Sequence, residues 1–268
     1  MNQTPPEIIT ATLIFIAFQL VIVLVILIAG RYYPALGRFR DRMISKWKPA
    51  LAIAGLYILS TGLGGRGILN PYMLAIFCQA LLGLTIASSI EGFEPLPVTN
   101  ALIQHNQIVR QTVLMLVISI LAVVPALLIG TIDLDIGRQI FGEANYTQQA
   151  ASTITNLAPN KWMVFFLLLA GAGIAEEMTY RLVCLSIIWK LTRRKWLAIL
   201  ISAVLFGVYH LTPLSGMYRT NWQFPISQFI ASTLIGLVWG YLFIKRGFET
   251  AVLGHTLSDW LPMMLFMR

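Results

Sequence analysis

Long apolar stretches separated by polar connections alternate along the chain. A membrane-spanning helix needs about 20 predominantly apolar residues, and most of these stretches are close to that length. The pattern predicts eight membrane-spanning helices, over residues 8–29, 50–64, 70–90, 111–130, 162–189, 196–213, 225–244 and 249–267. Polar residues fill two longer connections, 91–110 and 131–160, and the second is long enough to hold a short surface helix.

This pattern predicts an all-α, polytopic membrane protein with about eight transmembrane helices in one bundle. Residues 1–268 are expected to form a single membrane domain, because no repeat, low-complexity tract or soluble segment divides them. The composition excludes a soluble globular protein, since 57% of the residues are hydrophobic and 11% charged, against roughly 45–50% and 25% in soluble domains. A ridge of small residues predicts close packing of the helix over 225–244; its members are Ser232, Gly236 and Gly240.

Basic residues gather in the connections after the first, fifth and seventh predicted helices, which all lie on one side of the membrane in this topology. By the positive-inside rule that side is cytoplasmic, so we expect an outside N-terminus. The expected location of this multi-pass protein is a bacterial plasma membrane. The net charge of +8 therefore reflects topology and gives no indication of nucleic-acid binding. The residues are Arg31, Arg38, Arg40, Arg42, Lys46 and Lys48, then Lys190, Arg193, Arg194 and Lys195, then Lys245 and Arg246.

Six ionisable side chains lie inside the predicted spans, where a charge costs about 2.5–3.5 kcal/mol and by default marks a functional site. They are Glu176, Glu177, Arg181, His210, His255 and Asp259. Counted from the basic connections at about 1.5 Å per residue, the first glutamate and both histidines share one layer near the midplane. The sequence therefore predicts one polar site built from three helices.

Four-residue spacings place most of these side chains in pairs along helix faces. Glu177 and Arg181 can form an ion pair that offsets the cost of burying each charge. The Glu176 side chain points about 100° away from this pair, so it is available for another role. His255 and Asp259 also share a face, so the carboxylate either orients the ring or shares a substrate with it.

Aromatic residues accompany the polar ones. Phe206 precedes His210 by four positions, which predicts an aromatic ring beside the imidazole. Tyr180 and Tyr209 adjoin the polar positions as well. Together with Phe206 they are candidates for lining a substrate groove, although packing among apolar neighbours accounts for them equally well.

These residue types suit the activation of water. A carboxylate in a water-poor site becomes a stronger base, and a neutral histidine is a suitable second partner for the water. A second histidine and a neighbouring donor then stabilise the oxyanion of an attacked carbonyl. The chemistry favoured is hydrolysis, with a peptide bond as the expected substrate.

At these positions the sequence resembles the CPBP family, which includes the type II CAAX prenyl endopeptidases and bacteriocin-processing or immunity proteins. The resemblance covers residues 160–262 and rests on three motifs in order. They are Glu176-Glu177-x-x-x-Arg181, Phe206-x-x-x-His210 and His255-x-x-x-Asp259. One such motif is common on helices, but three in order, each within a predicted span, are a specific signal.

The resemblance implies an eight-helix intramembrane endopeptidase that acts on a membrane protein or a lipidated peptide. It assigns the activation of water to Glu176 and His210. It makes His255 a ligand of the oxyanion or the substrate, and Glu177 with Arg181 a supporting pair.

Asp259 stands where the prenyl endopeptidases have asparagine. An ionised aspartate cannot donate to an oxyanion, so Asp259 must be protonated, orient His255, or bind a metal. Zinc stays an open alternative with Glu176, His210 and His255 as its ligands, although the chain has no HExxH motif and each ligand lies on a different predicted helix.

Two further classes of function compete with proteolysis. A non-catalytic membrane partner, such as a bacteriocin-immunity protein or a chaperone for membrane proteins, would keep the fold without needing every polar group, and the complete set argues against it. A proton-coupled transporter also uses carboxylates and histidines at the midplane. The lack of an inverted repeat counts against a transporter.

Overall fold

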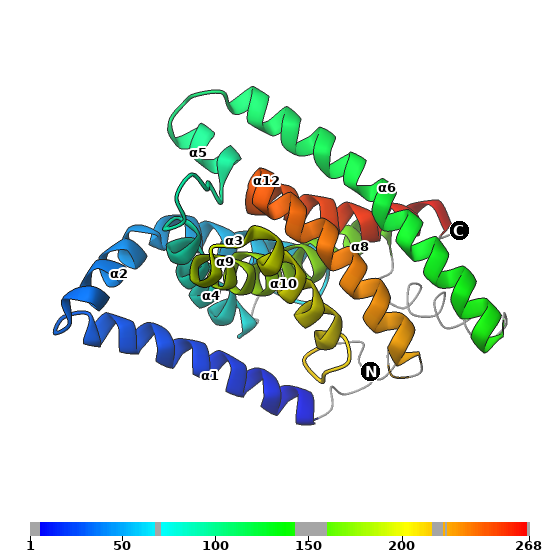
Figure 1. The fold of residues 1–268 in the computed structure, drawn as a ribbon, viewed down its shortest axis with the longest axis horizontal. Coiled ribbons are helices and arrows are strands. Elements are labelled where there is room, and N and C mark those ends of the chain that lie inside the picture. The colour runs from blue at the N-terminus through cyan, green and yellow to red at the C-terminus, as the bar shows by residue number, and fades with distance from the viewer. Residues whose placement is uncertain (1–5, 68–70, 143–159, 216–221, 223, 267–268) are drawn as a thin grey trace.

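The computed structural model describes residues 6–67, 71–142, 160–215, 222 and 224–266, and all regular structure within them is helical. This confirms the all-α class for the described chain. The elements, labelled as in Figure 1, are α1 (Pro6–Ala29), α2 (Pro34–Ser45), α3 (Trp47–Leu63), α4 (Tyr72–Ala87), α5 (Pro97–Ile103), α6 (Ile108–Phe141), α8 (Lys161–Leu168), η1 (Leu169–Glu176), η2 (Met178–Leu185), α9 (Ser186–Thr192), α10 (Lys195–Tyr209) and α12 (Pro225–Phe266).

Four helical segments of the described chain are long and apolar enough to cross a membrane. α4 and α10 are apolar but shorter, and α12 counts once although two predicted helices fall within it. The membrane-type class is therefore confirmed, whereas the number of eight spans is not. The four long segments are Ile9–Ala29, Ile108–Ile140, Lys161–Thr192 and Pro225–Pro262.

α1 and α6 lie at opposite edges of the molecule (Figure 1) and expose large apolar side chains such as Phe18 and Leu121. Surface of this kind suits contact with lipid. The main apolar core lies between these edges, and Leu84 of α4 and Leu182 of η2 are at most 1% exposed within it. A Cβ atom at Gly83 would lie 2.7 Å from Leu182 Cγ, so glycine allows α4 to hold η2 closely.

α6 is longer than predicted. The predicted span ends at residue 130, but the helix continues to Phe141. Two interactions favour the extension: isoleucines continue the apolar outer face at four-residue spacing, and Asp133 accepts a hydrogen bond from Ser227 of α12. The surface helix expected within 131–160 is thus replaced, up to Phe141, by the end of α6, and residues 143–159 lie outside the described chain.

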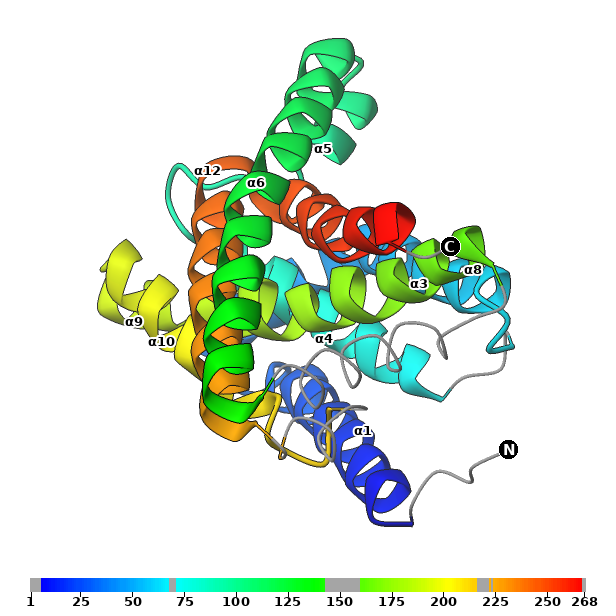
Figure 2. The same ribbon diagram turned by 90° about the vertical axis from the view of Figure 1, so that its right-hand side faces the viewer.

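α12 bends sharply at Gly247, so its two arms run in different directions (Figure 2), as the two predicted helices 225–244 and 249–267 require. Gly247 has φ of 80°, a conformation that favours glycine, and a Cβ there would lie 2.8 Å from the Pro95 carbonyl oxygen. The same carbonyl accepts a hydrogen bond from the Phe248 N–H at 2.8 Å. The Glu249 carboxylate accepts two more from backbone N–H groups at the start of α5, at 2.7 Å each. The connection before α5 therefore holds the bend.

The small-residue ridge of α12 packs against α10, which confirms the predicted close approach. A Cβ at Gly236 would lie 3.1 Å from Ala203 Cα and 3.3 Å from Phe206 Cδ1. One turn further on, a Cβ at Gly240 would lie 3.1 Å from Ile199 Cγ2. The two backbones are thus closer than larger side chains would allow.

We expect Gly236→Val to lower the free energy of unfolding by about 1–3 kcal/mol, the usual cost of overpacking, because the added carbons collide with α10. Thermal unfolding of the purified protein in detergent measures this as a lower Tm. Gly55→Val is the matched control, since a Cβ at Gly55 would have no atom of another described segment within 4 Å. An equal fall in Tm for both variants would contradict the close packing.

Candidate active site

The helix that carries the first motif, Lys161–Thr192, changes its winding around the motif. Its ends are α-helical, but η1 and η2 between them are π-helical. π-Helices are rare and occur mostly at functional sites, and their i→i+5 hydrogen bonds place more residues in each turn. Glu176 ends η1, and Glu177 lies between η1 and η2. The two acidic residues of the motif therefore sit in the widened part of the helix.

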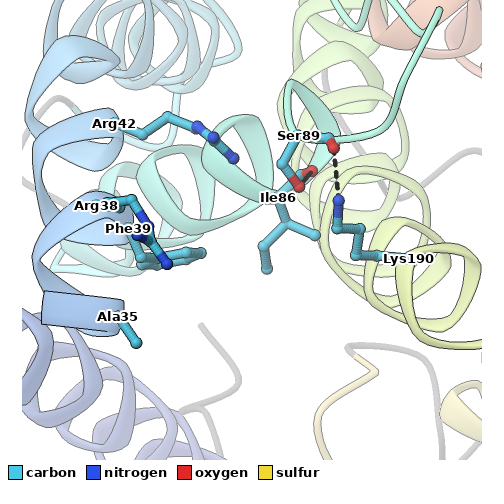
Figure 3. A pocket seen from close by; sticks show the side chains of 7 residues that line it. All are labelled: Ala35, Arg38, Phe39, Arg42, Ile86, Ser89 and Lys190. Carbon is cyan, nitrogen blue, oxygen red and sulfur yellow. Dashed lines mark hydrogen bonds between the residues drawn. The ribbon is translucent and has the colours of Figure 1, made fainter.

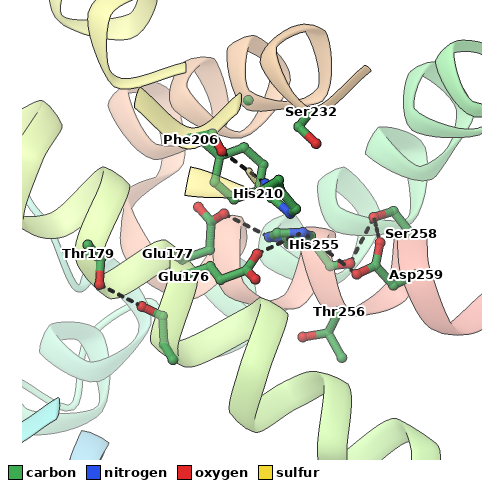
Figure 4. Close-up of polar contacts among 12 residues, drawn as sticks. Glu176, Glu177, Thr179, Phe206, His210, Ser232, His255, Thr256, Ser258 and Asp259 are labelled. Atoms are coloured by element: carbon green, nitrogen blue, oxygen red, sulfur yellow. Dashed lines mark hydrogen bonds and ion pairs between the residues drawn. The ribbon is translucent and has the colours of Figure 1, made fainter. Parts of the chain in front are cut away.

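Both neighbouring carboxylates face the same imidazole (Figure 4). Glu177 Oε1 accepts a hydrogen bond from Nδ1 of His255 at 2.8 Å, and Glu176 Oε2 lies 3.9 Å from Nε2 of the same ring. The side chains of Glu176 and Glu177 therefore point in more similar directions than the 100° between neighbouring residues of an ideal α-helix predicts. The two nitrogens lie on different edges of the ring, so two carboxylates can approach it from one helix.

The predicted ion pair between Glu177 and Arg181 is present and completely buried. Glu177 Oε2 lies 3.3 Å from Arg181 Nε, and both side chains are 0% exposed. Since the other oxygen of this carboxylate holds His255, the three residues form a continuous chain, Arg181–Glu177–His255. This buried chain joins the first motif to the third.

Arg181 also reaches two other helices. Its Nη2 donates a hydrogen bond to the Gly236 carbonyl of α12 at 3.3 Å. Its guanidinium carbon lies 4.5 Å from the centroid of the Phe206 ring on α10, a favourable cation–π distance. Arg181 therefore contacts the second motif directly, and it is the centre around which all three motifs meet.

Two carboxylates with accessible surface flank the other edge of His255. Asp259 Oδ2 lies 3.7 Å from Nε2, the nitrogen that Glu176 also approaches. The side chains of Glu176 and Asp259 are 19% and 37% exposed, while that of His255 is 5% exposed. Ser258 donates to Asp259 Oδ1 at 3.4 Å. The site thus has a buried side, at Nδ1, and an accessible side, at Nε2.

His210 lies at the C-terminal end of α10, not inside it. We predicted a helix up to residue 213, but α10 ends at Tyr209. His210 Nδ1 lies 2.9 Å from the Phe206 carbonyl oxygen, and since a carbonyl only accepts, Nδ1 carries the proton and Nε2 of the neutral ring is an acceptor. The Phe206 ring lies 4.6 Å from the ring of His210 and 5.8 Å from that of His255. One phenylalanine therefore packs against both histidines.

The three aromatic residues predicted to line a groove do cluster, but they differ in exposure. Tyr180 lies 5.3 Å from both Phe206 and Tyr209, measured between ring centroids. Phe206 is 2% exposed, so it packs in the interior and does not line an open groove, because Arg181 and the histidines enclose it. Tyr180 and Tyr209 are partly exposed and stay groove candidates.

Trp239 also belongs to the site, although it was not predicted there. This tryptophan of α12 is 0% exposed and stacks on the His255 ring at 5.3 Å and 20°. It packs against one face of the imidazole, whereas the carboxylates approach its edges. Its position near the middle of the predicted helix 225–244 was the available signal, since most other tryptophans lie near predicted helix ends.

The positions of the possible metal ligands do not support the zinc alternative. Within the described chain, no three histidine, cysteine, aspartate or glutamate side chains come together in a way that could hold a metal ion. Glu176, His210 and His255 therefore do not fit a zinc site with this geometry. We derive no chemical step through a metal.

The fold and the site define an all-α integral membrane protein whose membrane helices enclose a carboxylate–histidine site. Residues 158–261 match a family model, that of the Rce1-like type II CAAX prenyl endopeptidases. The matched segment contains all three motifs, so the resemblance inferred from them is confirmed. No curated protein and no solved structure matches the chain significantly.

We expect Arg181→Met to lower the free energy of unfolding by about 3–5 kcal/mol, because it leaves Glu177 charged and buried without its partner. Adding Glu177→Gln removes that charge, so the double variant should be more stable than the sum of the single effects predicts. Unfolding in detergent, followed for both single variants and the double variant, measures the coupling. Arg66→Met, at an exposed arginine, is the control for loss of one positive charge. If the effects of the two single variants simply add in the double variant, the buried contacts between Arg181, Glu177 and His255 are contradicted.

Proposed function

We propose that the protein is an intramembrane endopeptidase, which hydrolyses a peptide bond of a membrane-associated or lipidated protein with water activated by Glu176 and His210. The Rce1-like match supports a CAAX protease-type function, and four long apolar segments support an integral membrane protein. One observation carries the proposal: the accessible Glu176 carboxylate lies beside the buried Arg181–Glu177–His255 chain.

Burial divides the roles of the two neighbouring glutamates. Glu177 and Arg181 are 0% exposed, so neither can reach a substrate, and we assign them to positioning His255. Glu176 has accessible surface, and within the described chain no hydrogen bond occupies its carboxylate, which suits a general base. Two adjacent carboxylates with different surroundings commonly take different roles in catalysis.

In the proposed first step, Glu176 takes a proton from a water molecule while the water oxygen attacks the carbonyl carbon of the scissile bond. Nε2 of His210, an acceptor in the neutral ring because Nδ1 donates to the Phe206 carbonyl, accepts a hydrogen bond from the second O–H of the water, and that hydrogen stays on the oxygen. A water held by two acceptors directs a lone pair toward the carbonyl. A new C–O bond forms and the carbonyl π electrons move to oxygen.

In the second step the resulting oxyanion re-forms the carbonyl as the C–N bond breaks. The proton held by Glu176 passes to the departing amine nitrogen, so the carboxylate is regenerated. Nε2 of His255, in its protonated form, donates to the oxyanion, while Glu177 holds the opposite edge of the ring through Nδ1. Asp259, 3.7 Å from Nε2, orients the ring before the substrate arrives.

The proposed substrate is a membrane protein or a lipidated peptide, because the reactive groups lie on helices suited to the bilayer. The orientation with an outside N-terminus in a bacterial plasma membrane is also a proposal. Its support is that Arg38 and Arg42, from the first basic connection, line one cavity with Lys190, which begins the second. The first and second basic connections therefore lie on one side of the molecule, and the positive-inside rule makes a side rich in basic residues the cytoplasmic one.

We expect Glu176→Gln to reduce peptide cleavage by about 10²–10⁴-fold, the usual contribution of a general base, with little change in Tm. Cleavage of a fluorogenic farnesylated CAAX peptide, and of the same peptide without the lipid, by the purified protein measures this. Glu91→Gln, at an exposed turn, is the matched control and should retain wild-type turnover. Unchanged turnover in Glu176→Gln contradicts the glutamate mechanism, and no cleavage by the wild type favours the non-catalytic partner.

Treatment of the same assay with 1,10-phenanthroline should leave turnover unchanged, because the three predicted ligands do not converge on a metal position. The non-chelating 1,7-phenanthroline controls for effects of the hydrophobic reagent. Loss of activity with the first compound alone, followed by recovery on addition of Zn²⁺, would establish the zinc alternative instead.

A further inference from the structure

A cavity of about 500 Å³ lies between α2, the end of α4 and α9, within the size range of small-molecule sites. None of its lining residues belongs to the candidate active site. Figure 3 shows Arg38 and Arg42 extending from α2 on one side, with Lys190 of α9 on the other. Phe39 and Ile86 supply apolar walls.

No protein anion pairs with the three cations around this cavity in the part of the chain that the structure describes. Among the described residues, no carboxylate lies within ion-pair distance of Arg38, Arg42 or Lys190. Arg40 differs, since it contacts the Asp41 carboxylate at 2.7 Å. Positive charges gathered around one space repel each other unless an anion enters. The cavity is therefore electrostatically suited to a negatively charged ligand.

One of the cations is held in place by the backbone. Lys190 Nζ donates a hydrogen bond to the Ser89 carbonyl at 2.6 Å (Figure 3). An ammonium group has three donors, so two stay available to a ligand. The fixed ammonium and the two arginines approach the cavity from different helices.

The position of α2 places this cavity at the membrane surface. α2 follows the first long apolar segment directly and is amphipathic: Met43 is 1% exposed, while Arg38 and Arg42 are exposed. A basic amphipathic helix of this type lies in the interface between lipid tails and water. The cavity thus combines cationic groups with apolar walls at the level of lipid headgroups.

We propose that this cavity binds the phosphate of an anionic phospholipid, with Arg38 and Arg42 on the phosphate oxygens and the lipid chain against Phe39 and Ile86. Planar guanidinium groups suit phosphate geometry. Basic pockets between helices on the cytoplasmic side of membrane proteins bind anionic headgroups, and that is the side predicted here. Free phosphate would use the cations but leave the apolar walls without a partner.

Binding can be measured by adding short-chain phosphatidylglycerol to the purified protein in detergent and recording the Tm. We expect a saturable rise for the wild type and an apparent affinity at least about tenfold weaker for Arg38→Gln/Arg42→Gln, since the double variant loses both interfacial guanidinium groups. Both side chains are exposed, so the lipid-free Tm of the double variant should equal that of the wild type.

Arg31→Gln, at an exposed arginine outside the cavity, removes one charge at the same membrane surface and should keep wild-type affinity. Short-chain phosphatidylcholine should give no saturable rise, and inorganic phosphate a much weaker one. An unchanged affinity in the double variant overturns the proposal, and so does an equal response to phosphatidylcholine. An equal response to inorganic phosphate overturns the assignment to a lipid.

Discussion

The buried contact between Glu177 and Arg181 is the interaction on which the rest of the site depends. A charge without solvent must have a partner, and the partners of these two groups come from their own helix, α10 and α12. The carboxylate divides its oxygens between Arg181 and His255. The guanidinium adds the Gly236 carbonyl and the Phe206 ring. Helices far apart in sequence are thereby held together, because separating them would take a buried charge away from its partners.

The hydrophobic pattern predicts the helices well and their ends less well. The break between the last two helices was predicted, and Gly247 accounts for it. α6 exceeds its predicted length because Asp133 finds a partner, Ser227, on another helix, and α10 is shorter than its apolar run. Apolar length reports suitability for lipid, whereas the end of α6 also depends on a polar group that finds a partner on another helix.

The spacing of charges predicts which residues meet but not how each one is oriented. The four-residue spacing of Glu177 and Arg181 was sufficient to predict their pair. That both glutamates face His255 was not predictable, because π-helical winding leaves no simple signature in sequence. Trp239 was missed for a related reason: it belongs to the site through tertiary packing alone. The assignment of catalytic roles to these residues stays a prediction.

The bend of α12 has a mechanical consequence for the site. His255 lies eight positions beyond Gly247, a lever arm of about 12 Å, so a swing of about 10° at the bend would displace the imidazole by about 2 Å. That distance is enough to break its 2.8 Å hydrogen bond to Glu177. The connection before α5 holds the bend through hydrogen bonds of the Pro95 carbonyl and Glu249. It therefore sets the alignment of His255, which it does not touch.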